Sequence, residues 1–293
     1  MRIAILASGL TGYLDACLSA LLDRDIELLI ITKRARENVA YESLEIEKRT
    51  RVISWVEDPD PDELIAAVKG FAPDAVLMHS WDFKPYRAVV RSLRGQAVRV
   101  LWMDNNWLES PKQWIGRITS PLYIQPLFDV AFLPGDRTEA FARRLGFAAE
   151  DVIRGSLCAD TSLFGSDPVS GEDLLHRGRF ASALRMVHHK GADVLAEAYV
   201  HYRDLVANPW SLELIGTGPL LSSFDGVPGV IENGFLQPAE VAAVMHRSSC
   251  YVNPSRAEPY GVVLHEAAAA ALPILTSHMV GAAPTLVQDG DKG

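Results

Sequence analysis

Short apolar runs alternate with helix-like stretches through the first half of the chain. Apolar residues recur at helical spacing in residues 13–23, 61–71, 84–94 and 137–147. Between these stretches are six compact apolar runs of the kind that form strands buried on both faces: RIAIL (2–6), ELLIIT (27–32), RVISWV (51–56), AVLMHS (75–80), VRVLWMD (98–104) and DVAFLPG (129–135). Strand followed by helix, repeated, predicts a parallel sheet in a doubly wound α/β unit.

The pattern breaks at residues 158–173, where Ser, Asp, Gly and Pro are typical of a linker. Beyond it the alternation restarts, with predicted strands at 179–185, 211–216, 229–235, 250–255 and 272–277. We therefore predict an α/β protein of two Rossmann-like domains, residues 1–163 and 164–293. Such domains bind ligands at the carboxyl ends of their strands, so we expect a ligand cleft between them. The turn-rich ending PTLVQDGDKG leads us to expect that the second domain is incomplete.

Composition and charge narrow the classes of function. The net charge of −9 provides no general surface for the phosphate backbone of a nucleic acid. Three cysteines, Cys17, Cys158 and Cys250, are far apart, and none belongs to a CxxC, so neither a disulfide framework nor a zinc site is predicted. The first residues are typical of a strand rather than a signal peptide, and we expect a cytoplasmic protein.

A glycine-containing turn follows the first predicted strand. Gly9 and Gly12 surround Thr11 where this strand leads into a helix. The N–H groups and the positive dipole end of such a helix favour an anionic group. A tight turn that requires glycine explains the same residues equally well.

Two cations mark a junction in the second half. Arg185 ends a predicted strand and Lys190 precedes the next helix, an arrangement suited to a diphosphate without a metal. A solvated basic loop is the alternative. The later GTGPL, with Gly216 and Gly218, lacks a third glycine, so no dinucleotide fingerprint is present.

Two glutamates flank the start of a predicted helix in RAEPYGVVLHEAAAAALPIL. Glu258 and Glu266 are eight residues apart and would share a face of one helix. Pro259 and Gly261 place Glu258 in the preceding loop instead. The two carboxylates can therefore reach a ligand from different directions.

This stretch resembles the E-x7-E motif of retaining GT-B glycosyltransferases, specifically glycosyltransferase family four (glycosyl transferases group 1). The resemblance extends in order over most of residues 179–290, through LRMVHHKGADVLAEAY, LELIGTGPL, GVIENGFLQPAEVAAVM and CYVNPSRAEPYGVVLHEAAAAALPIL. Leu184 stands where a glycine is usual in the family, and Thr285 where an acid is common. The family also continues past a turn like DGDKG into a final helical region.

The resemblance implies metal-independent, retaining transfer of a sugar from a nucleotide-diphosphate donor, without a cofactor. It implies that Arg185 and Lys190 hold the diphosphate, that Glu258 meets the donor sugar and that Glu266 accepts hydrogen bonds from the ribose. His79, in PDAVLMHSW, takes the place of a histidine beside the reacting sugar, with a structural histidine as the alternative. The further donor contacts that it implies are Gly9, Gly12, Gly216, Gly218, Pro259, Tyr260, Gly261 and Val262.

The acceptor is expected to be a carbohydrate or a lipid-linked molecule. Asp104, Asn105 and Trp107 follow a strand end and mix polar groups with an aromatic ring that could stack on a sugar. A short predicted helix and its exit carry the cations Lys84, Arg87, Arg91, Arg94 and Arg99. A solvated helix face is the default interpretation, and a surface for an anionic membrane or a lipid-linked acceptor is the sharper alternative.

Three alternatives stay open at this stage. The acidic run at residues 57–63 has the D-x-D spacing of a metal-dependent sugar transferase, but its prolines favour a loop that caps a helix. The architecture also serves nucleotide-sugar 2-epimerases and non-catalytic nucleotide or glycan binders. Peripheral contact with the inner face of a membrane is left open, as is the oligomeric state.

Overall fold

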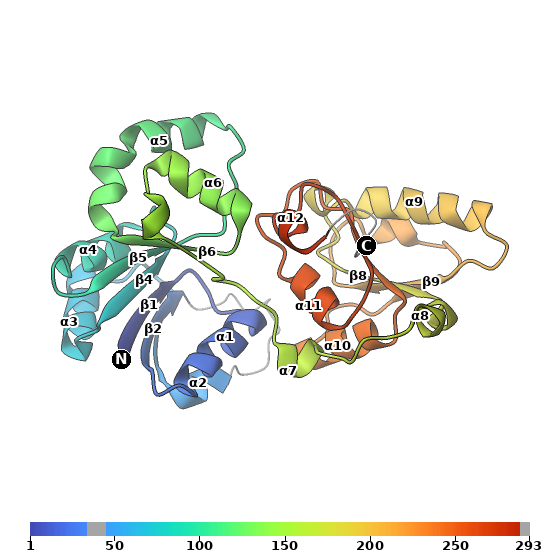
Figure 1. The fold of residues 1–293 in the computed structure, drawn as a ribbon, viewed down its shortest axis with the longest axis horizontal. Coiled ribbons are helices and arrows are strands. Elements are labelled where there is room, and N and C mark those ends of the chain that lie inside the picture. Colours follow the sequence, from blue (N-terminus) through green and yellow to red (C-terminus); the bar gives the residue numbers. More distant parts are fainter. Residues whose placement is uncertain (34–44, 288–293) are drawn as a thin grey trace. The chain divides into compact units, whose positions relative to one another are not determined.

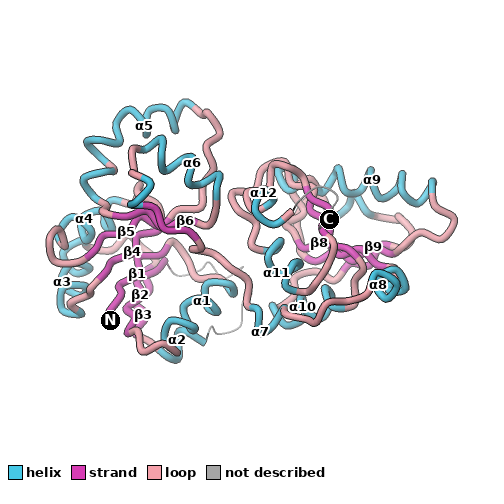
Figure 2. The backbone as a smooth tube through the Cα atoms, in the orientation of Figure 1, coloured by secondary structure: helices cyan, strands magenta, loops and turns pink. Residues whose placement is uncertain are grey.

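The computed structural model describes residues 1–33 and 45–287, so the DGDKG turn lies outside the described residues. The chain divides into two compact units, Met1–Cys158 and Ala159–Gly293. Each unit contains one parallel β-sheet, and the elements are labelled in Figures 1 and 2.

The first unit contains a seven-stranded sheet in the order β3-β2-β1-β4-β5-β6-β7. Its strands are β1 (Arg2–Ala7), β2 (Glu27–Lys33), β3 (Arg51–Trp55), β4 (Ala75–His79), β5 (Val98–Trp102), β6 (Val130–Leu133) and β7 (Val152–Arg154). The first six lie where the apolar runs predicted them. The prediction missed β7, because this edge strand has only three residues, two of them exposed, and so has no buried apolar run.

Helices cover both faces of this sheet, with α1 and α2 side by side on one face and α3 and α4 on the other (Figure 1). A cluster of buried residues, including Leu6, Met78 and Val89, packs β1, β4 and α4 together. The helices of the first unit are α1 (Gly12–Leu22), α2 (Glu45–Arg49), α3 (Pro61–Phe71), α4 (Lys84–Ser92), α5 (Pro111–Tyr123) and α6 (Asp136–Leu145), with 3-10 turns η1 (Gln125–Leu127) and η2 (Ala149–Asp151).

The second unit contains a five-stranded sheet in the order β10-β9-β8-β11-β12. Its strands match the five predicted runs: β8 (Arg179–Ala183), β9 (Ser211–Ile215), β10 (Val230–Glu232), β11 (Cys250–Asn253) and β12 (Ile274–Thr276). Its helices are α7 (Thr161–Phe164), α8 (Gly171–Arg177), α9 (Ala192–Leu205), α10 (Pro238–His246), α11 (Val263–Ala269) and α12 (Ala283–Leu286), with 3-10 turns η3 (His188–Lys190) and η4 (Leu221–Phe224).

The division between the units falls five residues before the predicted boundary after residue 163. The short helix α7 explains the difference, because it packs against α10 and α11 of the second unit. Phe164 is buried there, and its carbonyl oxygen lies 2.9 Å from Nε2 of His246. The sequence did not predict this contact, because the polar composition of residues 158–173 is typical of a linker.

A buried carboxylate ties the second sheet to α10. Glu213 of β9 is fully buried and accepts hydrogen bonds from Arg179 of β8 at 2.8 Å and from Arg247 at 2.6 Å. Burial alone would raise the pKa of Glu213, but the hydrogen bonds from Arg247 and Arg179 outweigh it and hold this pKa below its usual value. The strand that leads into the GTGPL turn is thereby fixed.

Candidate active site

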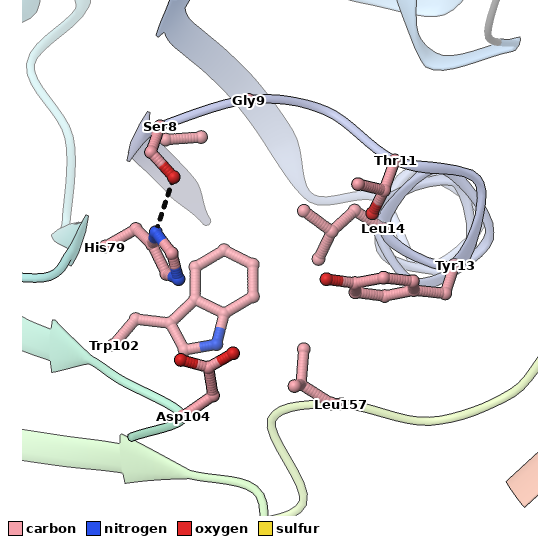
Figure 3. A pocket seen from close by; sticks show the side chains of 10 residues that line it. Ser8, Gly9, Thr11, Tyr13, Leu14, His79, Trp102, Asp104 and Leu157 are labelled. Carbon is pink, nitrogen blue, oxygen red and sulfur yellow. Dashed lines mark hydrogen bonds between the residues drawn. The ribbon is translucent and has the colours of Figure 1, made fainter. Parts of the chain in front are cut away.

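A cavity of about 130 Å³ lies at the carboxyl ends of the strands in the first unit (Figure 3). The order of the sheet reverses between β1 and β4, and ligands of open α/β sheets bind at such a switch point. The cavity opens there. The residues that line it are Ala7, Ser8, Gly9, Thr11, Tyr13, Leu14, His79, Trp102, Asp104 and Leu157.

His79 is held at the wall of this cavity by two neighbours. Its Nδ1 lies 2.8 Å from the hydroxyl oxygen of Ser8, and its ring meets that of Trp102 edge-on at 5.6 Å. Figure 3 shows the second ring nitrogen on the side away from Ser8. The predicted histidine is therefore oriented by Ser8, and Nε2 remains for a ligand.

The loop from Ser8 to Thr11 leaves space beside the cavity. A Cβ atom at Gly9 would meet no atom within 4 Å, and the φ of Gly9 is not positive. Packing in this unit therefore gives no steric reason for glycine at this position. Gly12 is the first residue of α1, with Thr11 as its N-terminal cap.

The three predicted acceptor residues occupy different environments. Asp104 lines the cavity, and Asn105 is exposed. Trp107 packs at 5.3 Å from the ring of Phe141, and Arg144 lies 5.4 Å above it. The structure thus packs the partly buried Trp107 against the core of the unit, and Trp107 is not among the residues that line the cavity.

In the second unit, Lys190 and Glu258 form an ion pair. The order of this sheet reverses between β8 and β11, and the two residues come from the loops that follow these strands. Their side chains are 15% and 14% exposed, so the pair is largely shielded from water. The fold therefore joins two residues that sequence analysis assigned to separate parts of a donor.

A second ion pair fixes these two loops to each other. Arg256 donates to both carboxylate oxygens of Asp193, at 2.5 and 2.8 Å, and to the carbonyl oxygen of His188 at 2.9 Å. The hydrogen bond from Arg256 lowers the pKa of Asp193 to about 2. Sequence analysis did not single out Arg256, since its role depends on a partner 63 residues away.

Arg185 is exposed beside this pair of loops. Its Nη2 atom lies 3.3 Å from Nε2 of His189, and the carbonyl oxygen of His189 accepts the N–H groups of Arg256 and Ala257. Arg185 and Lys190 thus come from one loop, as predicted, but only Lys190 is inserted against Glu258.

Gly216 and Gly218 are required by close packing of the GTGPL turn on the loop after β8. A Cβ atom on Gly216 would lie 2.1 Å from the carbonyl oxygen of Leu184, and a Cβ atom on Gly218 would lie 2.5 Å from the carbonyl oxygen of Met186. Both glycines also have positive φ, at +121° and +153°. This turn therefore needs glycine for structural reasons, whether or not a nucleotide also contacts it.

The segment between the two glutamates bends sharply before α11. Gly261 has φ +88°, and Tyr260 and Val262 on either side of it are buried. As predicted, Glu258 precedes the helix and Glu266 lies within it. Pro259, at the start of the bend, is exposed.

Glu266 is the most perturbed carboxylate of this segment. Burial raises its pKa to about 7, so its carboxyl group changes charge near neutral pH. Carboxyl groups whose pKa is strongly shifted are frequent at functional sites.

The acidic run at residues 57–63 caps a helix. The side chain of Asp60 accepts a hydrogen bond from the N–H of Asp62 at the start of α3, which confirms the capping interpretation. Within residues 1–33 and 45–287, no group of three or more His, Cys, Asp or Glu side chains is arranged to hold a metal ion.

Comparison with known proteins identifies the second unit. Residues 175–293 match the family model described as glycosyl transferases group 1. These residues are similar to a glycosyl transferases group 1 domain. No curated protein sequence is significantly similar to the chain.

Solved structures show the fold of the whole chain. Alr3699/HepE of Anabaena, solved with UDP and glucose, has a TM-score of 0.72 at 17% identity, over 99% of this chain and 84% of its own. WaaG, a glycosyltransferase involved in lipopolysaccharide biosynthesis, has a TM-score of 0.61 at 15% identity, and the match covers 97% of this chain and 83% of WaaG. The UDP-GlcNAc 2-epimerase of Methanocaldococcus jannaschii has a TM-score of 0.61 at 10% identity, and the match covers 99% of this chain and 87% of the epimerase. The fold is GT-B, and together with the family match it supports glycosyltransferase activity, EC class 2.4.

Proposed function

We propose that this protein is a metal-independent glycosyltransferase that moves a sugar from a nucleotide-diphosphate sugar to a carbohydrate or lipid-linked acceptor, with retention of configuration. The observation that supports it most is the Lys190–Glu258 pair at the switch point of a group 1 domain. The solved complex of the Anabaena neighbour with UDP-glucose supports a nucleotide sugar as the donor.

Different residues of the second unit would bind the diphosphate, the sugar and the ribose of the donor. Lys190 and Arg185 would neutralise the charge that develops on the diphosphate as the sugar–oxygen bond breaks. Glu258 would accept hydrogen bonds from the sugar hydroxyls, and Glu266 from the ribose. The leaving phosphate would take the proton of the acceptor hydroxyl, so no protein nucleophile is assigned.

The cavity of the first unit would serve the reacting end of the acceptor. His79, oriented by Ser8, offers one ring nitrogen, and Asp104 offers a carboxylate on the same wall. Both groups can hydrogen-bond a sugar hydroxyl. We infer a step of cell-envelope glycan or glycolipid synthesis in the cytoplasm as the setting.

An assay of products tests this function against the epimerase alternative, which the similarity to the Methanocaldococcus structure keeps in view. The protein is incubated with UDP- and GDP-sugars, with and without a mixture of glycan and lipid-linked acceptors, and products are separated by mass and NMR. We expect nucleotide diphosphate to be released together with a glycosylated acceptor of retained anomeric configuration. A sugar epimer formed without acceptor would show that the protein is an epimerase and not a transferase. Saturable binding without turnover would show a non-catalytic nucleotide or glycan binder.

Helix α5 presents an apolar surface that supports peripheral membrane contact. The exposed fractions of Ile118 and Leu122 are 75% and 78%, which is unusual for side chains of this size. With three further exposed residues they form what we call the α5 face: Trp114, Ile115, Ile118, Leu122 and Tyr123. Trp114, Ile118 and Leu122 follow one another at four-residue spacing along one side of the helix, and Ile115 and Tyr123 are the sequence neighbours of Trp114 and Leu122.

Cations accompany this face. Lys112 and Arg117 are exposed on α5, and Arg87 of α4 donates a hydrogen bond to the carbonyl oxygen of Tyr123. Apolar side chains beside cations suit an anionic bilayer, which we propose as the partner of the α5 face. None of the described helices is long and apolar enough to cross a membrane.

One of the five cations that the sequence placed on a solvated helix face, or alternatively on a membrane surface, lies elsewhere in the structure. Arg99 does not belong to a surface with the other cations, because it lies in β5, is 6% exposed and pairs with Asp129 at 2.5 Å. The apolar residues of α4, including Val89 and Val90, are buried. Insertion into lipid would therefore depend on α5, with α4 supplying charge.

Ile118→Ser with Leu122→Ser is expected to lower the affinity for phosphatidylglycerol-containing vesicles by at least about tenfold, because the transfer of each exposed aliphatic side chain into lipid would contribute roughly 1.5–3 kcal/mol. Co-sedimentation with vesicles measures this. The matched control is Leu175→Ser with Leu205→Ser, which removes two leucines of the second unit that are 64% and 85% exposed. Equal binding by both double variants would exclude the α5 face as the membrane contact.

A further inference from the structure

Two cysteines that are distant in sequence meet in the first unit. The sulfur atoms of Cys17 and Cys158 lie 3.3 Å apart, although 141 positions separate the residues. Because the sulfurs of a disulfide are about 2.05 Å apart, a movement of about 1.3 Å would bring them to bonding distance. Sequence analysis predicted no disulfide framework from these cysteines, and their spacing alone gave no reason to pair them.

Both thiols can be reached by a reagent. Cys158 is exposed and Cys17 is partly exposed. The third cysteine differs in this respect, since Cys250 is buried in β11 and its burial raises the pKa of its thiol to about 11. Thiolate is the reactive form of cysteine, so Cys250 provides an unreactive reference within the same chain.

We propose that Cys17 and Cys158 form a redox-modification site, at which a small-molecule disulfide such as glutathione disulfide oxidises the two thiols to an intramolecular disulfide. The thiolate of Cys158 attacks the reagent, forms a mixed disulfide and releases one thiolate. The thiolate of Cys17 then attacks the sulfur of Cys158 and releases the second. The protein loses two electrons and two protons, and the reagent becomes two thiols.

The disulfide would connect two walls of the cavity in the first unit. Cys17 lies one helical turn after Tyr13 and Leu14, which line the cavity from α1. Cys158 follows Leu157, which lines it from the other side. Cys158 is also the last residue of its unit. Oxidation would thus fix α1 to the segment at which the chain leaves this unit, whatever ligand the cavity binds.

The full-length protein is incubated with excess glutathione disulfide, denatured in acid and alkylated, and its intact mass and cross-linked peptides are determined. We expect alkylation of all three cysteines before oxidation and of Cys250 alone afterwards, with a Cys17–Cys158 peptide. The melting temperature of the first unit should rise by about 5 °C, because the cross-link closes a long loop of the unfolded chain. Dithiothreitol should reverse both changes.

Serine variants separate this proposal from general oxidation. Cys250→Ser should form the disulfide like the parent protein, whereas Cys17→Ser should accumulate one glutathione on Cys158 without a rise in melting temperature. Three alkylatable thiols after oxidation would overturn the proposal. So would two stable glutathione adducts, or a disulfide that links two chains through Cys158.

Discussion

Replacing Lys190 with Ala is expected to lower kcat/KM for sugar transfer by at least about 100-fold, because it removes a cation from the charge that develops on the leaving diphosphate. Arg185→Ala should have a smaller effect, since Arg185 is exposed whereas the Lys190 side chain is 15% exposed. Both variants should also bind UDP or GDP more weakly. Steady-state kinetics and isothermal titration calorimetry measure the two effects.

The ion pair makes a further measurement decisive. Because Lys190 and Glu258 contact each other, the double variant Lys190→Ala with Glu258→Ala should lose less activation free energy for sugar transfer, measured from kcat/KM, than the two single variants lose together. Lys69→Ala, which removes a lysine from the last turn of α3, provides the control. Unchanged nucleotide affinity in both Lys190→Ala and Arg185→Ala would refute the assignment of this loop to the diphosphate.

Glu266→Gln is expected to weaken UDP or GDP binding by about 10- to 100-fold, because a neutral amide replaces the charged acceptor and offers only one acceptor oxygen to the ribose hydroxyls. The pKa of about 7 adds a pH dependence. The ionised carboxylate is the better acceptor for ribose hydroxyls, so affinity should rise between about pH 6 and pH 8 in the parent protein. The same profile should be flat in Glu266→Gln.

Stability distinguishes this effect from damage to the fold. The folded pKa of Glu266 lies above the unfolded value of 4.5, so the folded state retains a proton that the unfolded state loses as the pH rises from 4.5 to 7. This group therefore makes the folded state less stable as the pH rises through that window, and Glu266→Gln removes the penalty. At pH 8 the melting temperature of the variant should be no lower than that of the parent, although its affinity for UDP or GDP is lower.

Glu258→Gln serves as the matched comparison. We expect UDP affinity within about threefold of the parent and a loss of transfer of about 100-fold, since this carboxylate is assigned to the sugar. Equal losses of UDP affinity in Glu258→Gln and Glu266→Gln would show that the two glutamates do not divide the donor as proposed.

Local sequence was sufficient for most of the architecture. Buried parallel strands need continuous apolar runs, and residues such as those of β1 and β9 supplied them clearly. The exceptions have local causes. Strand β7 is a short, exposed edge, and α5 lacks a buried apolar stripe because several of its large apolar residues face outward. Periodicity identifies burial, so an element that buries little is missed.

The sequence by itself determined most of the strands and helices, the two α/β units, and the positions of Glu258 before a helix and of Glu266 within it. Those features follow from spacing along one chain. Only the tertiary structure decided which residues meet: Lys190 with Glu258, Arg256 with Asp193, and Cys17 with Cys158. Parallel sheets bring together the loops of strands that are distant in sequence, and strand order, which depends on packing of the whole unit, fixes those pairings.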